Sequence, residues 1–248
     1  GGADRPATVE KEYLDASHKL SPMARTKAHK SEILCCAHMF LAAQSNPNGI
    51  LLTAGNDRTI KRWSINERLD LALDAQITCP NAAGHTVIHC HDDAISCMAV
   101  DGNFLFTGSD DSSIRIWNMG AESTYHPSGP LLDHSLVRVL DIKCGGHADA
   151  IRALLIIQPE GVLVSLSIDM VIKIWDYTKG LVLWETKHDA EEEITCMSYD
   201  SAKKNLVCGT DACTLITKDL PDLPRLLLQG ATSADDQHIA EDFGRSHV

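Results

Sequence analysis

The sequence predicts an all-β fold built from repeated four-stranded antiparallel sheets, and three observations lead to this prediction. A twelve-residue pattern occurs at 52–63, 106–117 and 164–175, with an Asp six residues before a Trp and an Ile midway between them. In front of each pattern, a His and three residues, most of them polar, precede an Ile that opens an apolar run. After each Asp, apolar and polar residues alternate as they do in half-buried strands. The repeat is therefore the structural unit of this chain.

Each repeat accounts for four strands in order. The first strand opens with an Ile after the His, as in HDDAISCMAV, and the second is an apolar segment such as NFLFTGS. A tight polar turn that holds the Asp leads to the third strand, which alternates as in SSIRIWN and carries the Trp. A fourth strand fits after the Trp and is clearest in GLVLWETK at 180–187. Short strands joined in this way predict one antiparallel sheet per repeat.

The fourth repeat is degenerate. Its segment LVCGTDACTLIT at 206–217 keeps Asp211 but has no Trp, and the gap after His188 is two residues longer than in the other repeats. The repeats span about 29–66, 91–120, 147–178 and 188–220. The connections at 64–90 and 118–146 are long, so we expect outer strands or loops there.

These repeats resemble the WD-repeat (WD40) family of β-propellers, whose blades are four-stranded sheets with a His-containing loop and a terminal Trp-Asp. The third repeat carries both the Gly-His pair (Gly146, His147) and the Trp-Asp pair (Trp175, Asp176), and the resemblance covers about 29–220. It implies about four β-propeller blades of antiparallel strands, as part of a ring that in this family usually closes with seven or eight. The expected divisions are an N-terminal segment at 1–28 that could hold an outer strand of a preceding blade, the WD40 repeat region at 29–230, and a polar C-terminal tail at 231–248.

The recurring His, Ser or Thr, Asp and Trp are expected to form one hydrogen-bonded latch in each blade, as the resemblance implies. The sets are His29, Thr53, Asp57 and Trp63; His91, Thr107, Asp111 and Trp117; and His147, Ser165, Asp169 and Trp175. A hydrolase triad also uses such side chains, but it needs one strained, accessible nucleophile beside an oxyanion hole. Three copies of the set in one chain favour a structural role, so we expect no enzyme activity and no cofactor.

The stretch CPNAAGHTVIHCH at 79–91 is the alternative with chemistry of its own. It offers Cys79, His85, His89, Cys90 and His91, and Cys with His is a plausible zinc set. His91 already belongs to a latch, however, and VIHCH alternates as a strand would. We therefore expect a surface insertion without a metal and keep metal binding as the less favoured hypothesis.

Two further features are interpreted as packing. Cys35, Cys97 and Cys196 occupy one repeat position, two residues after the strand-opening Ile, where the third repeat has Ala153. A position shared by Cys and Ala indicates a small buried slot rather than a ligand site. The apolar segment LPDLPRLLLQG at 220–230 is expected to be an outer strand or a packing arm.

Composition limits the expected partners and location. The chain has 34 acidic and 22 basic residues and a net charge of −12, which disfavours nucleic acid and anionic membranes as partners. No apolar run approaches the roughly 18 residues of a membrane span, and the first residues lack the features of a signal peptide. Nine cysteines, an odd number, indicate reduced thiols of an intracellular, cytoplasmic protein. The fourth repeat also resembles those of ciliary and axonemal complexes, which adds cilium and cytoskeleton to the expected locations.

The loops next to the latches are the expected partner-binding surface. Residues between each His and its Ile, and the residue before each turn Asp, should share one rim. The predicted binding residues are Glu32, Asn56, Asp92, Asp93, Asp110, Asp149 and Asp189. Such an acidic rim would dock a basic segment of another protein, although a merely solvated acidic surface is the simpler interpretation. We expect a non-enzymatic scaffold for protein–protein interactions within a larger complex, with the recruiting arm of an enzyme complex as the alternative.

Overall fold

The computed structural model describes residues 27–41, 49–65, 71–80, 86–87, 89–120, 124–125, 131–133, 135–158, 160–188 and 192–230. The predicted N-terminal segment, apart from residues 27–28, and the predicted tail at 231–248 lie outside these residues. No helix in the described part of the chain is long and apolar enough to cross a membrane.

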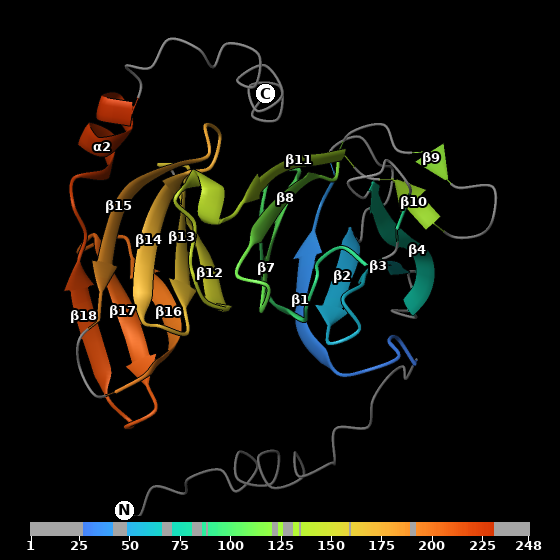
Figure 1. The fold of residues 1–248 in the computed structure, drawn as a ribbon, viewed down its shortest axis with the longest axis horizontal. Coiled ribbons are helices and arrows are strands. Elements are labelled where there is room, and N and C mark those ends of the chain that lie inside the picture. The colour runs from blue at the N-terminus through green and yellow to red at the C-terminus, as the bar shows by residue number, and fades with distance from the viewer. Residues whose placement is uncertain are drawn as a thin grey trace, which may run out of the picture.

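The described residues form four sheets that follow one another along the chain, which confirms the predicted all-β fold (Figure 1). The first sheet contains β1 (Ile33–Met39), β2 (Ile50–Gly55), β3 (Ile60–Ile65), β4 (Leu71–Pro80), β5 (Thr86–Val87), β9 (Thr124–Tyr125) and β10 (Leu131–Asp133). The second contains β6 (Ile95–Asp101), β7 (Phe104–Ser109), β8 (Ile114–Asn118) and β11 (Ser135–Leu140). The third contains β12 (Ile151–Ile157), β13 (Val162–Ser167), β14 (Val171–Asp176) and β15 (Leu181–Lys187). The fourth contains β16 (Ile194–Asp200), β17 (Asn205–Thr210) and β18 (Leu215–Asp219).

The two long connections fold in different ways. The first continues into β4 and β5, so that the outer strand of the first sheet precedes the second repeat. The second leaves β8, adds β9 and β10 to the outer edge of the first sheet through a parallel pairing of β10 with β4, and then returns as β11. A short 3-10 helix, η1 (Ile142–Cys144), then leads toward the third repeat. The chain therefore adds β9 and β10 to the first sheet before it forms β11, the outer strand of the second blade.

Of the two alternatives predicted for the segment at 220–230, the structure shows the packing arm and not the outer strand. Instead of an outer strand, it contains the helix α2 (Leu223–Gly230), beside β15 of the third sheet. Leu223, Leu226 and Leu227 lie at i, i+3 and i+4 and pack on the core between the third and fourth sheets. The expectation of a packing arm is thus met by a helix, because the apolar spacing has the helical rather than the strand period.

The cores lie between neighbouring sheets, because each innermost strand presents alternate side chains to the sheets on either side. In β6, Met98 and Val100 pack in the cluster shared with the first sheet, and Cys97 and Ala99 in the cluster shared with the third. The indole of Trp117 is fully buried in the first of these clusters. Packing between innermost strands runs from β1 to β6, from β6 to β12 and from β12 to β16.

The two ends of this row differ from its middle. In β1, Cys36 and His38 occupy the places of Met98 and Val100 in β6, but they are exposed. In the fourth sheet Cys196, expected to be a packing residue, is also exposed. The described sheets therefore form an open arc, with the first and fourth sheets apart (Figure 1).

The cysteine slot is buried only where a following sheet covers it. Cys35 faces the second sheet and its thiol donates to the Ile95 carbonyl at 3.6 Å, and Cys97 packs toward the third sheet. Burial raises the pKa of both thiols to about 12. These two cysteines are therefore unreactive packing residues.

Candidate functional site

In the first two blades the four predicted latch residues lie within hydrogen-bonding distance. In the second blade His91 Nε2 lies 2.8 Å from the Thr107 hydroxyl and His91 Nδ1 lies 2.9 Å from Asp111 Oδ2. The Trp117 indole N–H donates to the same Thr107 hydroxyl at 3.0 Å. A fifth residue, Ser113, donates to Asp111 Oδ1 at 2.6 Å. The hydroxyl of Thr107 is thus the node that joins the His loop to the third strand.

The first blade repeats this arrangement. His29 Nε2 lies 2.7 Å from the Thr53 hydroxyl, His29 Nδ1 lies 2.9 Å from Asp57 Oδ1, and the Trp63 indole donates to Thr53 at 2.8 Å. The hydroxyl of Thr59 donates to Asp57 Oδ1 at 2.8 Å, as Ser113 does in the second blade. Sequence reasoning missed Thr59 and Ser113, although both stand two residues after the latch Asp and share its turn.

The turn itself places the Asp. Each Asp accepts from the backbone N–H two residues on, as in Ser113 N to Asp111 Oδ1 at 2.9 Å, which is the geometry of an Asx turn. The residue after it takes a left-handed conformation, with φ of 61° at Arg58, 66° at Ser112 and 65° at Met170. The carboxylate is thereby turned toward the His of its own blade in the first two blades.

The charges of the latch are fixed by burial and by its hydrogen bonds. Burial alone would raise the pKa of Asp111, but the hydrogen bonds from His91 and Ser113 outweigh it and hold that pKa well below its usual range. Burial lowers the pKa of His91, against the opposing effect of Asp111. The latch is therefore a neutral imidazole beside a carboxylate at neutral pH.

The latch geometry leaves no room for a substrate beside these side chains. The hydroxyl that a hydrolase would use as nucleophile belongs to Thr107, which is 0 % exposed and already contacts both the imidazole and the indole. A substrate carbonyl would have to reach into a closed hydrogen-bond network. This arrangement holds strands together.

The third blade forms only half of the latch. His147 Nε2 lies 2.6 Å from the Ser165 hydroxyl, and the Trp175 indole donates to that hydroxyl at 2.8 Å. Asp169 instead accepts from the Ser167 hydroxyl and the Val171 N–H, and Val171 has no hydroxyl where Ser113 has one. The buried Nδ1 of His147 has no hydrogen-bond partner among the described residues. Burial and the nearby charge of Lys173 lower the pKa of His147 to about 4.

The fourth blade has a different register from the one that the sequence pattern indicates. Asp211 donates its N–H to the Glu193 carbonyl, as Asp110 does to Ala94, so it occupies the position before the latch Asp. The left-handed residue of this turn is Cys213, which puts Ala212 in the latch position. His188 likewise donates its N–H to Met170, as Cys90 does to Arg58, and so stands one residue before the position of His91.

Strand pairing completes this comparison. Leu105 pairs with Trp117 in the second blade, and Leu206 pairs with Lys218 in the fourth, so a Lys occupies the Trp position. A hydroxyl network replaces the latch: Thr214 and Thr210 donate to Glu192 Oε2 at 2.5 and 3.1 Å. These threonines and Glu192 were not singled out by the sequence pattern.

The predicted rim residues lie in loops that the backbone joins in the same way in every blade. The residue before the latch Asp donates its N–H to the carbonyl just before the innermost strand, as Asn56 does to Glu32 at 3.0 Å. The Asn56 side chain also donates to the Glu32 carboxylate at 2.9 Å. In the second blade this bond brings Asp110 next to the loop of Asp92 and Asp93. In the third blade Ile168 donates its N–H to the carbonyl of Ala150, the residue after Asp149. Asp189 lies outside the described residues.

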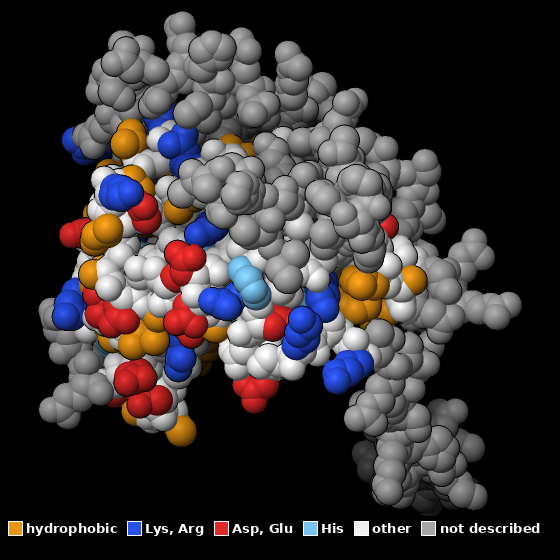
Figure 2. Space-filling view, turned by 45° about the vertical axis from the view of Figure 1, so that its right-hand side comes forward, with side chains coloured by type: hydrophobic (Ala, Val, Ile, Leu, Met, Phe, Trp, Pro, Cys, Tyr) orange, Lys and Arg blue, Asp and Glu red, His pale blue; other side chains and the backbone are white. Residues whose placement is uncertain are grey.

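Charge on this rim is not uniform. Burial and the neighbouring Asp93 raise the pKa of Asp110, while Arg152 acts in the opposite direction. The first blade contributes Lys30 and Arg58, and the Arg58 guanidinium donates to the Asp92 carbonyl at 3.2 Å. Figure 2 shows Asp and Glu side chains interleaved with Lys and Arg on the face that it presents. The rim of the first blade is therefore partly basic, whereas that of the second carries Asp92, Asp93 and Asp110.

The stretch at 79–91 has two of its five candidate ligands engaged elsewhere. The Cys90 thiol is buried and donates to the Ile77 carbonyl at 3.4 Å, and both nitrogens of His91 belong to the latch. The side chains of Cys79 and His85 lie outside the described residues, and no metal-binding cluster occurs among the residues described.

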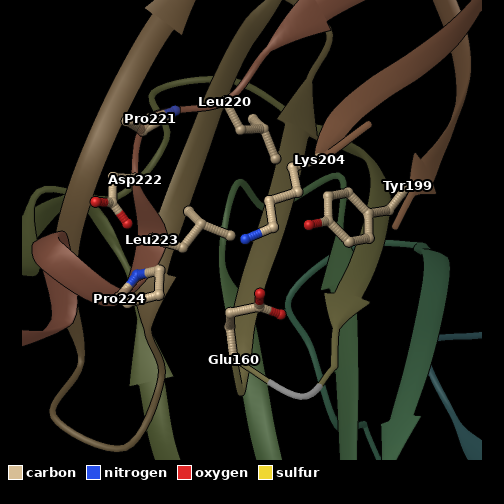
Figure 3. A pocket seen from close by; sticks show the side chains of 8 residues that line it. All are labelled: Glu160, Tyr199, Lys204, Leu220, Pro221, Asp222, Leu223 and Pro224. Atoms are coloured by element: carbon tan, nitrogen blue, oxygen red, sulfur yellow. The ribbon is translucent and has the colours of Figure 1, made fainter. Parts of the chain in front are cut away.

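A cavity of about 350 Å³ lies where the third and fourth sheets meet the segment that enters α2. It is lined by Glu160, Tyr199, Lys204, Leu220, Pro221, Asp222, Leu223 and Pro224 (Figure 3). Glu160, Tyr199 and Lys204 come from the third and fourth sheets and the turns between their strands, and the other five residues come from the segment that enters and begins α2. A second cavity of about 200 Å³ lies beside the turn of the first latch.

Comparison with known proteins agrees with this architecture. The family model described as "WD domain, G-beta repeat" matches residues 20–64 and 84–118. The F-box-like/WD repeat-containing protein TBL1X of Mus musculus is 25 % identical over 89 % of this chain and 38 % of its own length. The kinesin-like protein KIF21B of Homo sapiens is 22 % identical over 83 % of this chain and 11 % of its own length. The chain thus spans well under half of these relatives.

Solved structures show the same fold. The computationally designed Ika4 protein superposes with a TM-score of 0.52 at 21 % identity, covering 81 % of this chain and 99 % of that one. The computationally designed Ika8 protein gives a TM-score of 0.53 at 21 % identity, over 80 % of this chain and 49 % of that one. From its repeated sheets, its latches and these matches, we conclude that this chain carries WD40 repeats.

Proposed function

We propose that this chain is a non-enzymatic scaffold that holds protein partners in a larger assembly through the latch-side loops of its blades. The proposal rests on one observation. The recurring His and Thr side chains, with the Asp in the first two blades, are already hydrogen-bonded within the blade latches, as in the buried set around Thr107. What remains available on that side of the molecule is a series of polar loops held on rigid sheets, an arrangement suited to binding other chains.

The acidic loops of the second blade are the proposed docking point for a basic segment. Asp92 and Asp110 reach the surface beside Asp93, and the raised pKa of Asp110 reflects burial and the crowding of like charges. A Lys or Arg side chain of a partner would relieve this repulsion, increasing both the association rate and the selectivity.

The test is cross-linking mass spectrometry on the chain in extracts of its source cells, comparing two variants. Asp92→Asn/Asp93→Asn/Asp110→Asn removes the acidic cluster but keeps the oxygen that accepts from the Ala94 N–H at Asp93. Asp219→Asn/Asp222→Asn removes charge from the fourth blade and serves as the control. We expect the triple variant to lose cross-links between Lys30 and other proteins, and the control to retain them. Unchanged cross-links in the triple variant would contradict the docking role of these loops.

A second candidate is a recruiting or regulatory arm of an enzyme whose catalytic part lies elsewhere. It is favoured by the small share, 5 % to 38 %, that this chain spans of its relatives, because those proteins carry much additional sequence. A cytoplasmic, ciliary or cytoskeletal location belongs to the same proposal, and fluorescence microscopy of the tagged protein would test it.

A further inference from the structure

The cavity beside the first latch has an unusual charge for so acidic a chain. Its lining residues are Lys30, Asn56, Asp57, Arg58, Thr59, Lys61, Gln76 and His89. They come from the loop before β1, the turn between β2 and β3, the strands β3 and β4, and the entry to the second blade. Three cations therefore face one carboxylate, that of Asp57, whose oxygens are held by the latch.

No described carboxylate forms an ion pair with the cations of this cavity. Lys61 Nζ donates to the Ala28 carbonyl at 2.6 Å, and Arg58 Nη1 donates to the Asp92 carbonyl at 3.2 Å. Among the described residues, no ion pair joins Lys30, Arg58 or Lys61 to an acidic side chain. The Nε2 of Gln76 is buried there, with no hydrogen-bond partner in the described part of the chain. The cavity thus offers several unused N–H donors and a positive field.

Comparison with the third blade explains why Lys61 has no carboxylate partner. Lys61 on β3 pairs in register with Gln76 on β4, and Lys173 on β14 pairs in register with Glu185 on β15. In the third blade the two side chains form an ion pair at 2.7 Å. In the first blade an amide replaces the carboxylate, so that the cation keeps its charge but loses its counter-ion.

The second blade has no cation at the positions that correspond to Lys30 and Arg58. At the positions of Lys30 and Arg58 it has Asp92 and Ser112, as the matching backbone bonds to the latch Asp and the matching left-handed turns show. The positive cavity is therefore a property of the first blade alone among the blades with a complete latch.

We propose that this cavity binds the phosphate group of a phosphorylated Ser or Thr side chain on a partner protein. A phosphate carries nearly two negative charges and three strong acceptor oxygens, which match two ammonium groups, a guanidinium and an unpaired amide. A single carboxylate would satisfy fewer of these donors. The site borders the acidic loop of the second blade at the Asp92 carbonyl, but its three cations belong to the first blade. It therefore goes beyond the scaffold proposal and does not depend on it.

The test is a titration of the ¹⁵N-labelled chain with the peptide acetyl-Gly-phosphoSer-Gly-amide, followed by NMR at constant ionic strength. The same peptide with Ser or Glu in place of phosphoserine serves as the ligand control. We expect saturable shifts of the Arg58 and Lys61 amides, with the phosphopeptide binding at least about tenfold more tightly than the Glu peptide. Equal affinity for the two peptides would overturn the assignment to a phosphorylated side chain, and the absence of saturable shifts would overturn the site.

Two variants locate the site in this cavity. Gln76→Glu supplies the counter-ion that Glu185 supplies in the third blade, and we expect it to weaken phosphopeptide binding by about tenfold or more without loss of thermal stability. Arg58→Gly removes a cation and suits the left-handed turn, so it should weaken binding in a folded protein. Glu185→Gln is the matched control and should bind as the parent does.

Full binding by both Gln76→Glu and Arg58→Gly would contradict the proposal. The Asp92→Asn/Asp93→Asn/Asp110→Asn variant should not lose affinity for the phosphopeptide, because Asp92 meets Arg58 through its backbone carbonyl and the charges removed are negative. The scaffold proposal and the phosphate site can therefore fail independently.

Discussion

The second and fourth blades share a backbone but not a latch. Asp110 and Asp211 make the same backbone bond at the start of the turn, and Ser112 and Cys213 have the same left-handed conformation, with φ of 66° and 62°. The second blade joins these elements through Thr107 and Trp117. At the equivalent register positions the fourth blade has Cys208 and Lys218. Strand pairing and turn geometry therefore suffice to shape the three inner strands, which are all that the fourth sheet has among the described residues.

What the latch adds is burial of a large side chain and satisfaction of buried polar groups. Trp117 is fully buried in the core shared with the first sheet, and its indole N–H has a partner in Thr107. In the fourth blade Lys218 is half-buried and β18 is largely exposed. The two blades thus separate the contribution of the backbone from that of the side-chain latch.

The largest expected effect distinguishes the two blades at the Trp position. Trp117→Ala should lower the free energy of unfolding by about 3–5 kcal/mol, because it empties a packed site and leaves a buried hydroxyl with one partner fewer. Lys218→Ala at the same position of the fourth blade should change it by about 0.5 kcal/mol or less. Urea unfolding monitored by circular dichroism measures both, and equal losses would mean that the fourth blade depends on its third strand as strongly as the second does.

The next effect concerns the incomplete latch of the third blade. The pKa of His147 falls to about 4 in the folded chain, whereas an unfolded His titrates near 6.5, so only the unfolded state takes up the proton between these values. Stability should therefore be complete above about pH 6.5 and decrease by about 2–3 kcal/mol as the pH falls toward 4. Unfolding free energies measured across this range should show a shallower pH dependence in His147→Gln. An identical slope in that variant would show that His147 is charged in the folded protein.

The smallest expected effect tests what the two blades have in common. Ser112→Gly and Cys213→Gly should each raise the free energy of unfolding by about 0.5–1 kcal/mol, because glycine adopts a positive φ without the steric cost of a side chain. The two gains should be similar, since the turn is the same with and without a latch. A gain in only one blade, measured by thermal unfolding, would show that the latch carries strain of its own.

Much of the fold followed from residue spacing. The six-residue interval from Asp to Trp, with the Ile midway, places the third strand, because strand side chains alternate and a register slip would turn the Trp to the opposite face. The same pattern identified the members of the latches in the first two blades, which the structure brings together. Helix α2 was missed because its leucines lie in a short, proline-containing segment that is also compatible with a strand.

The sequence by itself determined the repeated unit, its strand order and the His, Thr, Asp and Trp of the first two latches, because these depend on spacing within one blade. Only the tertiary structure decided how each set is used. Ser167 engages the third latch Asp and leaves His147 Nδ1 without a partner, and the fourth turn is set one residue later than its Asp suggests. Lys61 loses its counter-ion because a Gln pairs with it across β3 and β4. That pairing depends on a bulge and on a connection of variable length, so residue spacing alone cannot reveal it.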